Sequence, residues 1–163
     1  MMARLLVLGC LTMLASGCWG ARIQQADWRG DPVRRLIRNQ LVGDNLNDPE
    51  LYLGPEIHFP DNESKRYYLH LKSSYPIIDS ESELVIEVDG RRQSLPVDTD
   101  LWTDGGSGMR SEARFESSES FLVTMAHARE IVVFFEDYRK FFGPKGLEEF
   151  SGFVLAHVDG GLP

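Results

Sequence analysis

The sequence contains very little cysteine, which excludes a fold stabilised by disulfides. Its two cysteines, Cys10 and Cys18, both lie near the amino terminus. No later residue can form a disulfide or act as a catalytic thiol. Stability must therefore come from an ordinary hydrophobic core.

The sequence also lacks the spacings that mark a metal or nucleophile site. The four histidines, His58, His70, His127 and His157, stand alone, and no two have the i, i+4 spacing of a zinc-binding helix. Residues 105–109 miss the last glycine of a nucleophile elbow. We therefore expect no cofactor and no metal.

An excess of positive charge is missing too. The chain has a formal net charge of −8, with 42% hydrophobic and 26% charged residues. This composition is typical of a folded globular domain, and the negative charge argues against a general nucleic-acid binder. We therefore expect no nucleic-acid partner.

The amino-terminal apolar segment is short. Arg4 precedes an apolar run of about ten residues, which ends in Ala15, Ser16 and Gly17. A membrane-spanning helix needs about 20 apolar residues. The layout therefore predicts a cleaved secretory signal peptide over residues 1–17.

The residues at the end of this segment resemble the lipobox of bacterial lipoproteins. Ala15, Ser16 and Gly17 precede Cys18, and in that family the cysteine sulfur receives a diacylglycerol. The chain is then cut before the cysteine, and the freed amine is acylated, commonly with palmitate. The resemblance implies that Cys18 is the first mature residue and the lipid anchor.

One position departs from the commonest lipobox, because Ala15 stands where leucine is preferred. Ordinary signal peptidase cutting near Gly17 or Gly20, which would give a soluble secreted protein, is the alternative. Trp19 follows the cysteine, whereas an aspartate there retains Gram-negative lipoproteins in the inner membrane. The resemblance therefore implies an outer-membrane location, on either the periplasmic or the cell-surface side.

We expect a lipidated tether over residues 18–30 and a single domain over residues 31–160. Asp31 and Pro32 are typical of a helix start, and the apolar residues that follow recur at helical spacing up to Gly43. Between residues 18 and 40, five arginines stand against two aspartates. This basic stretch either contacts anionic headgroups or pairs with the acidic domain.

Alternating patterns predict strands in the middle of the chain. Leu84, Ile86 and Val88 share one face and precede Asp89 and Gly90, a pair typical of a tight hairpin. We expect further strands over residues 65–73, 109–116, 131–136 and 138–142, and helices over residues 121–128 and 147–158. The expected fold class is α+β, a mainly antiparallel sheet with flanking N- and C-terminal helices.

The expected core combines residues from these strands and from the closing helix: Leu69, Leu71, Leu84, Ile86, Val88, Val132, Phe134, Phe150 and Val154.

Two classes of function fit these observations. The first is a membrane-anchored binding or structural module of the bacterial envelope, whose partners are the membrane, through the lipid, and an envelope protein. Residues 98–108 are expected to form a loop in which Leu101 and Trp102 contact that partner. The second is a periplasmic hydrolase whose carboxylates, among Asp98, Asp100, Asp104 and Glu112, converge in three dimensions.

Overall fold

The computed structural model describes residues 22–28, 30–43, 45–61, 63–78, 81–104 and 110–159. These residues form ten strands: β1 (Arg22–Trp28), β2 (Asp31–Ile37), β3 (Leu41–Gly43), β4 (Leu51–His58), β5 (Arg66–Ser73), β6 (Glu83–Val88), β7 (Arg91–Asp104), β8 (Arg110–Ser117), β9 (Ile131–Phe135) and β10 (Tyr138–Phe142).

The strands form one sheet that curls back on itself. Their order is β1-β2-β4-β5-β8-β7-β6-β9-β10-β3, and every pair is antiparallel. At the far end of this order, β3 pairs with β10, while Gln40 just before β3 bridges to Tyr52 of β4. The end formed by β3 therefore returns to β4, so the sheet encloses a core.

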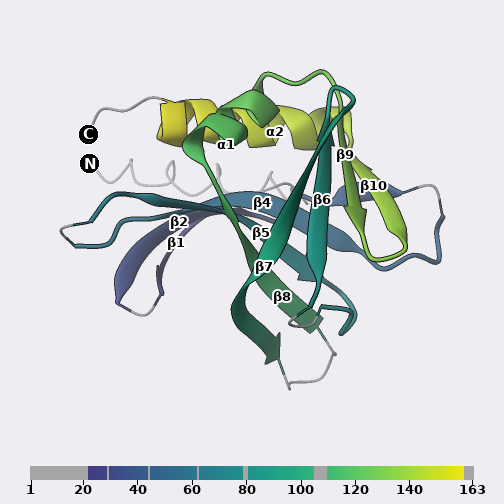
Figure 1. Ribbon diagram of the computed structural model, residues 1–163, viewed down its shortest axis with the longest axis horizontal. Helices are drawn as coiled ribbons and strands as arrows, with labels where there is room; N and C mark the ends of the chain where they lie inside the picture. Colours follow the sequence, from purple (N-terminus) through teal and green to yellow (C-terminus); the bar gives the residue numbers. More distant parts are fainter. Residues whose placement is uncertain are drawn as a thin grey trace, which may run out of the picture.

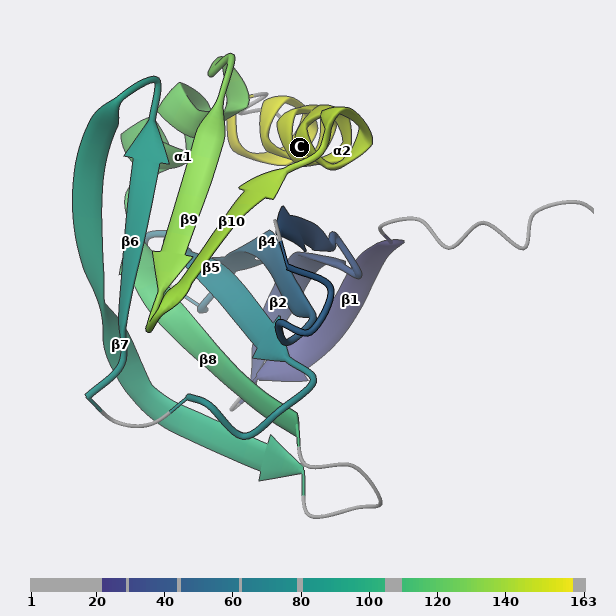
Figure 2. The same cartoon turned by 90° about the vertical axis from the view of Figure 1, so that its right-hand side faces the viewer.

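Two short helices cover this core, and both come late in the chain. They are α1 (Glu119–Ala126) and α2 (Pro144–Val154), and the π-helical turn η1 (Leu155–Asp159) continues α2. Figures 1 and 2 show the two helices side by side over one end of the curled sheet, while β1 and the end of β7 extend to the other side. Among the described residues, no helix is long and apolar enough to cross a bilayer.

The expected fold class, an α+β domain with flanking N- and C-terminal helices, is wrong. The described residues form mostly antiparallel sheet, and both helices among them come late in the chain. The predicted helices near residues 121–128 and 147–158 are present as α1 and α2.

The N-terminal helix predicted over residues 31–43 is the main error. These residues form β2 and β3 instead. Val33 and Leu36 are both buried, although alternation along the strand places them on opposite faces of the sheet. Because residues on both faces of this strand are buried, the sequence does not alternate between apolar and polar residues. The spacing of its apolar residues therefore resembles that of a helix. Strand β1 occupies residues that we expected to belong to the tether.

The hairpin and most of the predicted core are confirmed. Asp89 and Gly90 have φ values of 47° and 83°, and they join β6 to β7. All the predicted core residues are buried except Phe134, which lies under the guanidinium of Arg92 at 4.5 Å from the ring centre. Phe134 and Val132 alternate with Ile131 and the other core residues of β9, so they face outward.

A glycine permits the close approach of β2 and β4. A Cβ atom on Gly54 would collide with the carbonyl oxygen of Leu36. Beyond this point Arg38 adopts a φ of 63°, which turns the chain from β2 towards the bridge between Gln40 and Tyr52. Because Gly54 has no side chain, β2 can pack closely against β4. The chain then turns into β3, which pairs with β10.

Candidate functional site

The residues predicted as sites lie mostly outside the described part of the structure. Cys18 precedes the first described residue. Leu101 and Trp102 belong to β7, where Trp102 is opposite Glu112 of β8, and their side chains lie outside the described part.

The loop predicted over residues 98–108 is therefore wrong as far as Asp104. Asp98 and Asp104 pair with Arg114 and Arg110 of β8, and this pairing outweighs the turn preference of aspartate, with an irregular register between Asp98 and Trp102. Residues 105–109 lie outside the described part.

Charged side chains gather on the face of β4, β5 and β8 that points away from the hydrophobic core. Glu56 lies at the centre of this charged cluster and is 0% exposed. Its Oε1 accepts hydrogen bonds from His58 Nε2 at 2.6 Å and from Arg114 Nε. Arg35 Nη1 of β2 lies 3.5 Å from Oε2. One carboxylate therefore ties three strands together.

A second carboxylate extends the charged cluster along β5 and β8. Glu112 accepts hydrogen bonds from Lys72 Nζ at 2.6 Å and from His70 Nε2 at 3.1 Å. The cross-strand register explains this contact, because Lys72 is directly opposite Glu112 and His70 is opposite Arg114. The two halves of the cluster thus meet at His70 and Arg114.

Both carboxylates are held in their ionised form. Burial raises the pKa of Glu56, but the hydrogen bond from His58 and the charges of His70 and Arg114 outweigh it and lower the pKa from 4.5 to about 2. Burial likewise raises the pKa of Glu112, and the contacts with His70 and Lys72 lower it to about 2. At neutral pH neither group carries a proton that it could donate.

This electrostatic arrangement suits a structural role better than acid catalysis. A general acid in a hydrolase needs a raised pKa, so that it is protonated at working pH. Glu56 and Glu112 have the opposite shift, and each is already bound by at least two cationic or imidazole donors. No group of residues suited to hold a metal ion occurs among those described.

The charged cluster was not predicted, although the sequence contains a signal for it. Its histidines do not have the helical spacing of a metal site. Strand spacing instead places Glu56 with His58, His70 with Lys72, and Glu112 with Arg114, each pair at i, i+2. Three segments with such pairs could have indicated a polar face.

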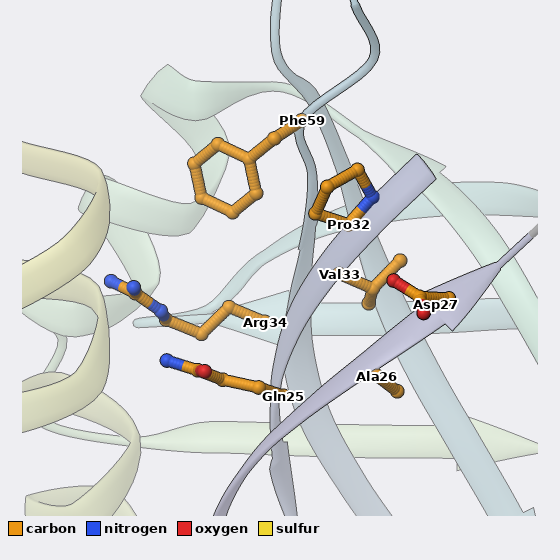
Figure 3. A pocket seen from close by; sticks show the side chains of 7 residues that line it. All are labelled: Gln25, Ala26, Asp27, Pro32, Val33, Arg34 and Phe59. Carbon is orange, nitrogen blue, oxygen red and sulfur yellow. The ribbon is translucent and has the colours of Figure 1, made fainter. Parts of the chain in front are cut away.

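A shallow hollow of about 460 Å³ lies beside β1 and β2 (Figure 3). It is lined by Gln25, Ala26, Asp27, Pro32, Val33, Arg34 and Phe59. In Figure 3, Gln25 and Arg34 extend in the same direction, towards the helices.

Two contacts hold the guanidinium of Arg34 in place beside this hollow. Its Nη1 donates to Nδ1 of His157 in η1 at 3.1 Å, and its Cζ lies 5.8 Å from the ring centre of Phe59. Burial and the charge of Arg34 lower the pKa of His157, which favours the neutral imidazole that can accept this hydrogen bond. Lys65 Nζ lies 5.7 Å from the same Phe59 ring. One cation, Arg34, thus lines the hollow, and a second, Lys65, contacts the ring of the lining residue Phe59.

Comparisons of the chain with family models, curated proteins and solved structures found no significant match. The functional argument therefore rests on the residues and on the geometry described above.

Proposed function

We propose that this protein is a bacterial envelope lipoprotein, anchored in the outer membrane through lipid on Cys18, and that its domain works as a binding or structural module. The anchor rests on the likeness of residues 15–18 to a lipobox. The binding role rests on the charged cluster, because its two carboxylates, the buried Glu56 and the partly buried Glu112, are ionised and occupied by donors within the domain, which argues against acid catalysis by them.

An anchored module benefits from its location. Holding the domain at a membrane raises its effective concentration towards envelope proteins without adding a contact. Several acyl chains, each stabilising by about 0.8 kcal/mol per buried methylene, would hold it there durably.

Metabolic labelling with a fatty-acid analogue tests the anchor. The wild-type protein should be labelled, and Cys18→Ser should lose the label and accumulate as unprocessed precursor. Cys10→Ser is the matched control, since it removes the other cysteine of the chain and should be labelled and processed normally. A Cys18→Ser protein that remains labelled and is cut to the same size would contradict the proposal.

Crosslinking from intact membranes tests the binding role. Leu101 and Trp102 remain the predicted partner contacts, and Trp102→Ala should reduce capture of the partner while changing the melting temperature little. A large loss of thermal stability would assign Trp102 to a packing role. Turnover of an envelope substrate by the purified protein would overturn the binding proposal and favour the hydrolase.

A further inference from the structure

Strand β1 presents an open sheet edge. It pairs with β2 along all seven residues from Arg22 to Trp28, and no strand of the described part lies on its other side. The opposite end of the sheet differs, because Gln40 beside β3 bridges to β4 and the amide of Leu53 donates to the carbonyl of Asn39. On its outer edge, β1 therefore has backbone donors and acceptors that pair with none of the described strands.

The edge has few of the features that usually prevent pairing. Natural edge strands are commonly protected by proline, charged side chains, a bulge or short length. β1 has seven residues, contains no proline and pairs with β2 in continuous register, and its two charged residues, Arg22 and Asp27, lie towards its ends. Ile23 is 56% exposed on it.

The hollow lies directly on this edge and adds a specificity element. Gln25, Ala26 and Asp27 of β1 form part of its wall, and Arg34 and Phe59 form another part. An added strand would lie about 4.8 Å from β1, and every second side chain would point to the side of the hollow. A long acidic side chain there could reach across Gln25 towards the guanidinium of Arg34, because Arg34 is directly opposite Gln25 in β2.

Charge indicates which side chain fits. Arg34 lines the hollow and Lys65 lies near the ring of Phe59, another lining residue, while Asp27 lies near the end of the strand. A carboxylate is therefore favoured opposite Gln25 and disfavoured opposite Asp27, which fixes the register of the added strand.

We infer that β1 accepts an extended segment of a partner protein as an additional strand, and that this segment places one carboxylate side chain in the hollow beside Arg34. This inference rests on the proposed binding function and names the surface and the partner chemistry. A second copy of the chain, paired antiparallel and centred on Gln25, would place Ile23 opposite Asp27 and bring no carboxylate to Arg34, whereas pairing centred on Ala26 would place Asp27 opposite Gln25; the dimer measurement below distinguishes such a copy from a partner segment.

A synthetic strand tests the inference directly. The probe is a fluorescent nine-residue peptide of alternating threonine and valine with one central glutamate, and binding to the purified full chain is followed by anisotropy. We expect saturable binding, weaker by about threefold to fivefold when glutamine replaces the glutamate, as for a partly exposed charge pair. N-methylation of alternate backbone amides on the pairing edge should abolish binding.

Substitutions around the hollow test where the glutamate of the bound peptide lies. Lys65→Gln and Arg34→Gln should each reduce the preference for glutamate over glutamine. Arg91→Gln, which changes an exposed arginine beside the Asp89–Gly90 turn, should leave it unchanged. Lys65 is exposed, so its variant tests the hollow even if Arg34→Gln weakens the contact with His157.

Two results would overturn the inference. The first is equal binding of the N-methylated peptide, which would show that no backbone pairing occurs. The second is a dimer in light scattering that the peptide does not dissociate, which would assign the edge to a second copy. Either result leaves the labelling of Cys18 unaffected, so the anchor is judged separately.

Discussion

Replacement of Glu56 by glutamine should destabilise the protein strongly. The change keeps the size of the side chain but removes the charge that faces Arg35 on the neighbouring strand β2 and Arg114 on β8, which lies beyond β5. Breaking a buried ion pair by neutralising one partner typically costs about 3–5 kcal/mol. Because Glu56 is 0% exposed, water cannot compensate for the loss.

The lowered pKa of Glu56 gives a second way to calculate the free energy by which its charge stabilises the fold. A pKa near 2 in the folded protein, compared with 4.5 for a free carboxyl, corresponds to about 3 kcal/mol. Because the folded-state pKa is the lower one, this stabilisation is fully present above pH 4.5 and is lost as the pH falls towards 2. Glu112 contributes in the same direction, by less because it is more exposed.

Urea denaturation at pH 7 and at pH 2.5 measures both effects. Glu56→Gln should lose about 3–5 kcal/mol at pH 7 and show a weaker dependence on pH below 4.5 than the wild type. Glu116→Gln is the matched control, since Glu116 is an exposed carboxylate on β8, and it should change stability by less than about 0.5 kcal/mol. If Glu56→Gln matches the wild type in stability and in pH dependence, the charged cluster does not hold these strands together.

Two further substitutions test the packing of the sheet. Gly54→Ala should force β2 away from β4 and lower the midpoint of chemical denaturation, since its Cβ would collide with the carbonyl of Leu36; an unchanged midpoint would refute the close approach. Ile86→Ala removes a side chain that is 0% exposed and should cost about 2–5 kcal/mol in the same assay, whereas Ile23→Ala, at an exposed site on β1, should cost far less.

Local chemistry explains which parts of the fold could be predicted. The turn at Asp89 and Gly90 needs positive φ, and few other residue pairs accept it, so the β6–β7 hairpin follows from the sequence. Helix α2 begins at Pro144 after a glycine and buries Phe150 and Val154 on one face, which the helical period indicates. Both signals lie within a short stretch of chain.

The features that were missed depend on pairing between distant strands. Val33 is buried on the polar face of the sheet and Leu36 on the core face, which only the contact with β4 determines. The charged cluster likewise requires the register that places Arg35 opposite Glu56 and Lys72 opposite Glu112. Single-sequence periodicity cannot supply a register between strands.

Mass spectrometry of the protein extracted from cell membranes tests the proposed anchor most directly. The account predicts an amino-terminal peptide that begins at Cys18 and carries a diacylglycerol on sulfur and a further acyl group on the amine. An unmodified peptide that begins near Gly17 or Gly20, recovered from a soluble fraction, would contradict it.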